Sequence, residues 1–134
     1  MTVLRRVFAL LAWVYLGAVV VQIFLAGLGL PQLGGEGMGI HAEFGYVAVH
    51  MTPILLILFA AISRAGKALI WWTVATAVVA FVQPIWVTSF RGEVLASVHV
   101  LGALVLLALS FQVARLATVR MRAHAASSET ADNR

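Results

Sequence analysis

The stretch GEVLASVHVLGALVLLALSFQVARLATV, from Gly92 to Val119, is apolar along almost its whole length, with Glu93 near its start and Arg115 near its end. A helix needs about 20 apolar residues to cross the hydrocarbon core of a bilayer, which is about 30 Å thick. Three more stretches of this kind precede it, over about 3–29, 41–63 and 68–90. The sequence therefore predicts four membrane-spanning helices.

The composition leads to the same class of protein. The chain has 134 residues, of which 63% are hydrophobic and 10% charged, whereas soluble domains carry about 25% charged residues. Four spans with short connections occupy nearly all of it and leave no room for a soluble catalytic domain. We therefore expect an all-α, integral membrane four-helix up-down bundle over 1–122, followed by a disordered cytoplasmic tail over 123–134. The chain lacks cysteine, which excludes iron–sulfur ligation, thiolate zinc sites and covalent c-type haem attachment.

The basic residues are placed asymmetrically along the chain. Eight of the nine lie at the N-terminus, between the second and third helices, or at the C-terminus, namely Arg5, Arg6, Arg64, Lys67, Arg115, Arg120, Arg122 and Arg134. The other connections carry Arg91 together with Glu36, Glu43 and Glu93. This is the positive-inside pattern, which predicts that both termini lie in the cytoplasm. The membrane expected is the bacterial cytoplasmic membrane. Topology thus accounts for the net charge of +4, and nucleic-acid binding is not expected.

Each apolar stretch contains one polar residue at a similar depth. In order these are Gln22, His50, Gln83 and His99. At a rise of about 1.5 Å per residue, all four lie roughly 10–13 Å below the outer ends of their helices. Polar side chains inside a bilayer are costly and mark functional sites. The chain also forms a weak repeat of two hairpins, each a Gln helix followed by a His helix, so we expect the four side chains to share one site.

His41 precedes His50 by nine residues on the same predicted helix. Nine residues correspond to about 900° of α-helical rotation, so the two side chains are expected on opposite faces, about 13 Å apart along the axis. The sequence therefore predicts that one metal ion cannot bind both. His41 is expected near the outer boundary of the membrane, as an interfacial polar residue or as a contact for protons or haem propionates.

A pair of histidines on two helices of a membrane bundle suggests b-type haem. Imidazole is a haem axial ligand, and bundle cores commonly hold cofactors between facing helices. We expect His50 and His99 as axial ligands of the haem iron, Gln22 and Gln83 as hydrogen-bond donors, and Gly102 with its small neighbours as space for the porphyrin. The expected function is electron transfer with a quinone or a respiratory-chain protein. The chain shows no nucleophile–base pair, acidic dyad or phosphate loop, so an electron carrier is favoured over an enzyme.

Two other interpretations stay open. In the first, the polar band only joins helices of a scaffold or accessory protein, through the pairs Gln22–His50 and Gln83–His99. In the second, His50 and His99 bind copper or zinc, or relay protons, as part of a transport system. The sequence leaves the oligomeric state open, with a homodimer as one alternative.

Three runs of the sequence resemble a family of small four-helix bacterial membrane proteins, known mainly from actinobacteria and classed as a domain of unknown function. They are Gln22-Ile23-Phe24-Leu25-Ala26-Gly27-Leu28-Gly29, His41-Ala42-Glu43-Phe44-Gly45-Tyr46 and Leu95-Ala96-Ser97-Val98-His99-Val100-Leu101-Gly102. The resemblance covers about residues 5–120 and implies the fold and the membrane location, without an activity or a cofactor. The H-x-x-x-G pattern at His41 and Gly45 is also similar to His-bearing helices of membrane cytochromes and haem-modifying synthases. That likeness would make His41, in place of His50, the ligand from the second helix.

Overall fold

The computed structural model describes residues 2–29 and 37–132, and all of its elements are helical. In chain order they are α1 (Thr2–Leu28), α2 (Gly37–Phe44), the π-helix η2 (Gly45–His50), α3 (Thr52–Ile62), α4 (Lys67–Ser89), the 3₁₀-helix η3 (Val94–Ser97) and α5 (Val98–Asp132). Four of the resulting rods are long and apolar enough to cross a membrane, over Val3–Leu28, Gly37–Ile62, Lys67–Ser89 and Val94–Ala126. The chain is thus an all-α, multi-pass membrane protein.

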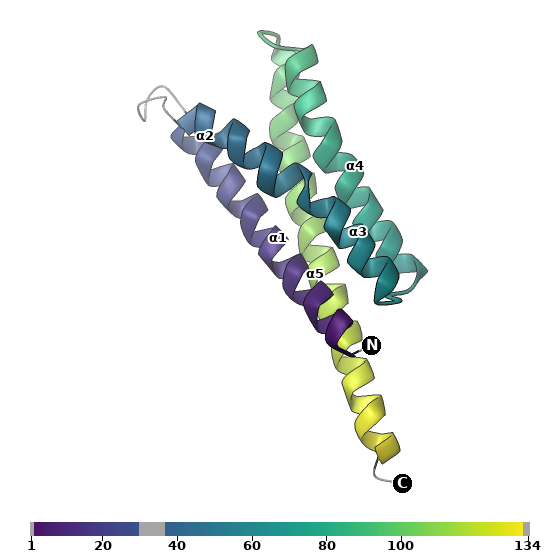
Figure 1. The fold of residues 1–134 in the computed structure, drawn as a ribbon. Helices are drawn as coiled ribbons and strands as arrows, with labels where there is room; N and C mark the ends of the chain where they lie inside the picture. The colour runs from purple at the N-terminus through teal and green to yellow at the C-terminus, as the bar shows by residue number, and fades with distance from the viewer. Residues whose placement is uncertain (1, 30–36, 133–134) are drawn as a thin grey trace.

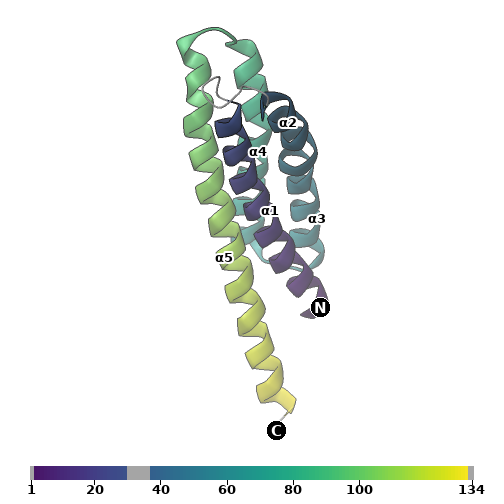
Figure 2. The ribbon, with the colours of Figure 1, turned by 90° about the vertical axis from the view of Figure 1, so that its left-hand side faces the viewer.

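The four rods form an up-down bundle. Elements α2, η2 and α3 follow one another as a single bent rod beside α1, and α4 and α5 form the second hairpin (Figure 1). Helix α1 packs most extensively against α5, which also packs against α4. The N-terminal end of α1, the turn between α3 and α4 and the C-terminal part of α5 lie at the same end of the molecule, and α5 extends beyond the bundle there (Figure 2).

Two of the predicted boundaries differ from the structure. Helix α2 begins at Gly37 instead of about residue 41, so Gly37 and Gly39 are helical and not part of a loop. The predicted disordered tail is helical to Asp132, which is consistent with its alanines, the strongest helix formers. The rest of the expected glycine-rich loop, with Pro31, Gly34 and Gly35, lies outside the described residues.

Small and apolar side chains fill the interior, while large apolar side chains cover the outside. The buried set includes Phe8, Ala12, Tyr15, Val19, Leu56, Leu69, Ala80, Val113 and Ala114. Exposed apolar residues such as Leu10, Phe24 and Ile85 occur on every rod. In a bilayer these outward side chains meet lipid, and small interior residues let the helices approach closely.

The second rod is not a regular α-helix. Between α2 and α3 the chain forms the π-helix η2, followed by Met51 and then Pro53 in the first turn of α3. Proline has no amide hydrogen to donate to the carbonyl of Val49, four residues earlier. The hydroxyl of Tyr15 on α1 donates a hydrogen bond of 3.2 Å to that carbonyl oxygen instead. The break in the rod is therefore held by a neighbouring helix.

Candidate functional site

A cavity with a largely apolar lining and five Gln and His side chains lies between the four rods. Its lining comprises Val19, Gln22, Ile23, Ala26, His41, Val49, His50, Ala80, Gln83, His99, Val100, Ala103 and Leu106, and its volume is about 110 Å³. A neighbouring cavity of about 270 Å³ shares Gln22, His41, His50 and His99 with it and adds Arg91 to the lining. All four residues of the predicted polar band, Gln22, His50, Gln83 and His99, thus line one cavity, together with His41.

Gln22 and His41 form the first polar unit of the site. The Gln22 side-chain amide donates 2.9 Å to the carbonyl oxygen of His41, and its nitrogen also lies 3.3 Å from His41 Nε2. In return, His41 Nδ1 lies 3.1 Å from the backbone oxygen of Gln22. A carbonyl oxygen can only accept, so Nδ1 carries the proton. In a neutral ring this leaves the lone pair on Nε2.

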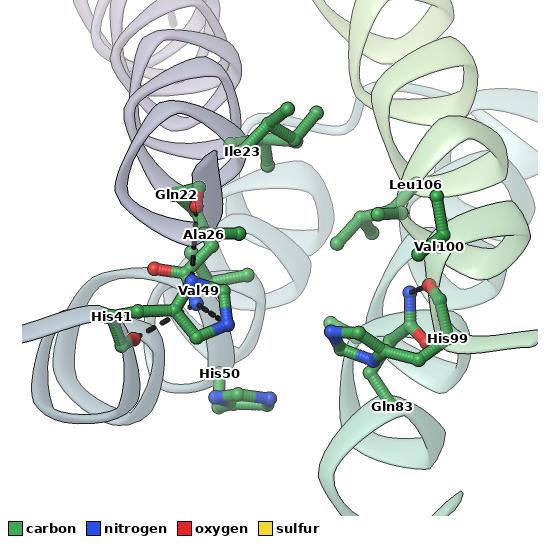
Figure 3. A pocket seen from close by; sticks show the side chains of 13 residues that line it. Gln22, Ile23, Ala26, His41, Val49, His50, Gln83, His99, Val100 and Leu106 are labelled. Carbon is green, nitrogen blue, oxygen red and sulfur yellow. Dashed lines mark hydrogen bonds between the residues drawn. The ribbon is translucent and has the colours of Figure 1, made fainter. Parts of the chain in front are cut away.

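Gln83 and His99 form a second unit of similar construction. The Gln83 side-chain amide donates 3.3 Å to the carbonyl oxygen of His99. In both units, therefore, a Gln of one rod binds the backbone of a His on the next rod. Figure 3 shows His41 on one side of the cavity and His99 with Gln83 on the other.

A glycine accompanies each Gln. A Cβ on Gly45 would lie 2.6 Å from Gln22 Nε2, and a Cβ on Gly102 would lie 2.5 Å from Gln83 Oε1. Both glycines let the amide lie directly against the opposite backbone. The repeat predicted from the sequence matches His50 with His99. In the structure Gln22, His41 and Gly45 correspond instead to Gln83, His99 and Gly102.

His50 lies in the last position of the π-helix and is only 9% exposed. Its Nδ1 lies 2.5 Å from the carbonyl oxygen of Gly45, so Nδ1 carries the proton and Nε2 is the acceptor. The ring lies beside Tyr46 and Phe81, with centroid separations of 5.5 and 6.4 Å. A backbone carbonyl on one imidazole nitrogen is a usual arrangement for a metal-ligating histidine.

Two imidazole nitrogens in the cavity are left without partners. His50 Nε2 and His99 Nδ1 are buried and make no hydrogen bond with any residue that the structure describes, and the same holds for Gln22 Oε1. A buried polar group without a partner costs about 1–3 kcal/mol. The site therefore contains polar atoms that its own hydrogen bonds do not satisfy.

The rings of His41 and His99 face one another across the cavity. Their centroids are 6.3 Å apart and their planes make an angle of 84°. Edge-to-face ring pairs in proteins have centroids about 4.5–7 Å apart. The two imidazoles therefore form an edge-to-face pair in the cavity.

Three expectations from the sequence change at this site. His41 and His50 line the same cavities rather than opposite faces, because a π-helical turn takes in one more residue than an α-helical turn and so rotates less per residue. Gln22 pairs with His41 and not with His50. Gly102 lies against Gln83 instead of providing open space beside His99.

The structural roles of Tyr15 and Gly45 were not predicted from the sequence. Tyr15 is 1% exposed, and its hydroxyl is the polar group that holds the broken rod. The available signals were a tyrosine inside an apolar stretch and a proline four residues after Val49.

Fold and site together define a four-helix membrane protein with two Gln–His units beside a largely apolar cavity. Comparison with family models, curated proteins and solved structures finds no match to this chain. The resemblance to the small actinobacterial membrane family stays a prediction.

Proposed function

We propose that this chain is a small b-type cytochrome-like protein that binds one haem non-covalently between its two hairpins. The observation that carries the proposal is the pair of imidazoles of His41 and His99 in one cavity, with ring centroids 6.3 Å apart, which would hold the haem iron between them. Bound haem supplies one-electron redox chemistry. In a membrane, a quinone or a respiratory-chain protein is the matching electron partner, and the charge asymmetry favours the bacterial cytoplasmic membrane.

The residues present suit the cofactor in three respects. His99 contributes a ring with a nitrogen that no described residue satisfies. The two adjoining cavities together reach the range of about 300–1,000 Å³ that small-molecule sites have, and their lining is largely apolar. Arg91 lines the larger cavity, and a guanidinium is a suitable partner for a propionate carboxylate.

His41 is favoured over His50 as the ligand from the second rod. The ring of His41 pairs with that of His99, and its Nδ1 proton is held by the backbone of Gln22. Its Nε2 lies 3.3 Å from the Gln22 amide nitrogen, so that amide would have to turn away when a ligand bond forms. The ring of His50 lies instead beside Tyr46 and Phe81. His50 stays the alternative, because its Nε2 is available and its Nδ1 is anchored to a carbonyl.

The interpretation in which the polar band only joins helices explains only part of the site. Hydrogen bonds account for the side-chain amide nitrogens of Gln22 and Gln83 and for both ring nitrogens of His41. They leave the imidazoles of His50 and His99 incompletely satisfied. A conventional copper or zinc site also has less support, since no group of three or more His, Asp or Glu side chains gathers anywhere in the described ranges.

The test is spectroscopic. The full chain is expressed in a haem-sufficient bacterium, purified in mild detergent, and examined in its oxidised and dithionite-reduced states. We expect a Soret band with sharp α and β bands on reduction. His99→Ala and His41→Ala abolish this spectrum, while His50→Ala and the exposed control His124→Ala keep it.

The other results lead to different conclusions. Loss of the spectrum in His50→Ala but not in His41→Ala would move the ligand to His50 and keep the function. A colourless, monodisperse wild-type protein that also takes up no haem in reconstitution would overturn the proposal. Metal analysis of that sample would then separate a metal site from a purely structural polar band.

A further inference from the structure

A third, smaller cavity lies at the end of the bundle where the N-terminal part of α1, the turn between α3 and α4, and α5 come together. It is lined by Arg5, Phe8, Ser63, Arg64, Ala65, Leu69, Ala117, Arg120, Met121 and His124, and we name it the basic pocket. Three of these residues are arginines from three different segments: α1, the turn between α3 and α4, and α5. The lining contains no carboxylate. Positive charge is thus gathered here without a neutralising side chain in the lining.

Two of the arginines are fixed in place by the turn. Arg5 Nε donates 3.2 Å to the carbonyl oxygen of Ser63, and Arg120 donates to the carbonyl oxygen of Ala65. A guanidinium has five N–H donors. Each of these arginines therefore keeps donors for another acceptor after binding the turn.

Arg64 occupies a position that favours glycine. Helix α3 ends in a Schellman motif, in which the amide of Ala65 donates 3.0 Å to Ala60 and that of Arg64 donates 3.1 Å to Ala61. The residue at this position of the motif adopts the left-handed conformation and is usually glycine. Arg64 adopts it with φ of 51°, although a side chain is disfavoured there. A residue kept at a locally unfavourable position is a reason to look for a function of its side chain.

The level of the pocket in the bundle indicates its ligand. Trp71 and Trp72, within the first two turns of α4, are 69% and 40% exposed. Exposed tryptophans at the end of a membrane span mark the level of the lipid headgroups. Basic pockets between membrane helices at that level bind phosphate-bearing headgroups.

We propose that the basic pocket binds the phosphate group of an anionic phospholipid, with Arg64 closing over a group held by Arg5 and Arg120. Its volume of about 20 Å³ holds little more than one atom of the size of a water oxygen, which needs roughly 10–15 Å³. One phosphate oxygen therefore enters the pocket, and the rest of the headgroup lies at its mouth beside the exposed Arg64. This inference does not depend on haem binding.

The test compares the full chain in nanodiscs of phosphatidylcholine alone, in nanodiscs that also contain phosphatidylglycerol, and in phosphatidylcholine with millimolar inorganic phosphate. Thermal midpoints are measured, and retained lipids are counted by native mass spectrometry. The variants are Arg64→Gly, Arg64→Lys and the control Arg122→Ala, which removes an exposed arginine of α5 that does not line the pocket.

We expect phosphatidylglycerol to raise the midpoint of the wild type and to be retained by it. Arg64→Gly raises the thermal midpoint in phosphatidylcholine alone, because glycine suits the left-handed position. The same variant loses most of the rise in midpoint that phosphatidylglycerol gives to the wild type. It also retains at least about tenfold less phosphatidylglycerol. Arg64→Lys keeps the charge but retains less lipid than the wild type, since lysine lacks the planar fork. Arg122→Ala behaves as the wild type.

Each departure from this pattern has one meaning. If inorganic phosphate reproduces the gain and phosphatidylglycerol adds nothing, the pocket binds phosphate from solution and the lipid assignment is overturned. If Arg122→Ala loses as much of the phosphatidylglycerol effect as Arg64→Gly does, the lipid responds to surface charge in general. That result would reject lipid binding by the basic pocket. An unchanged response in Arg64→Gly would likewise reject it.

Discussion

The hydroxyl of Tyr15 on α1 donates a 3.2 Å hydrogen bond to the carbonyl oxygen of Val49, the group that Pro53 leaves without an amide partner. The tyrosine is almost fully buried and lies among core residues. One side chain thus links the first rod to the break in the second, immediately beside His50. This contact joins the stability of the bundle to the shape of the cavity.

Tyr15→Phe should therefore destabilise the protein with little change in packing. Removing the hydroxyl leaves the Val49 carbonyl unsatisfied in a buried place, which costs about 1–3 kcal/mol. The free energy of unfolding can be measured by titration with SDS in mixed micelles. A loss below a few tenths of a kcal/mol would show that the carbonyl finds another partner and that Tyr15 does not hold the break.

The four spans and their order could be predicted from the sequence because a bilayer imposes length and apolarity on each helix. The common depth of Gln22, Gln83 and His99 followed from the same constraint, since helical rise converts residue number into depth. All three residues line one cavity in the structure.

The rotation of the second rod could not be predicted in the same way. A π-helical turn is a choice of hydrogen-bond register made by the folded bundle, and no residue type specifies it. Counting 100° per residue therefore placed His41 and His50 on opposite faces, whereas both line the cavity. The pairing of Gln22 with His41 was missed for the same reason.

The glycines that accompany the Gln side chains give a prediction with a built-in contrast. Gly102→Ala brings a Cβ within 2.5 Å of Gln83 Oε1, whereas nothing lies within 4 Å of a Cβ at Gly17. Gly17→Ala should stabilise its helix by up to about 1 kcal/mol through helix propensity. The free energy of unfolding of Gly102→Ala should be about 1 kcal/mol lower than that of Gly17→Ala. The reason is that the Gln83 side-chain amide has to move and loses its hydrogen bond to His99. Equal effects of the two substitutions on thermal unfolding would contradict the close contact.

A polar contact also crosses the extensive interface between α1 and α5. Trp13 Nε1 donates 2.9 Å to the hydroxyl oxygen of Thr118, and such interhelical bonds in membranes contribute about 0.6 kcal/mol on average. Thr118→Val should cost about this amount. Thr88→Val is the matched control, because the Thr88 hydroxyl bonds only within its own helix. The unfolding midpoint of Thr118→Val should be lower than that of Thr88→Val. Identical midpoints would show that the Trp13–Thr118 hydrogen bond does not stabilise the interface between α1 and α5.

The rotation of α2 offers the sharpest test of which histidine serves the site. Glu43 lies in α2 between His41 and η2, and its side chain is exposed. Inserting one alanine after Glu43 adds a residue to this α-helical segment, which turns His41 by about 100° relative to His50 and Pro53. If His41 is an axial ligand, the insertion abolishes the haem spectrum while far-UV circular dichroism still reports a helical protein. Glu43→Ala keeps the register and should keep the spectrum. An insertion variant with the wild-type spectrum would exclude His41 and leave His50 as the partner of His99, since the register from His50 to the C-terminus is unchanged.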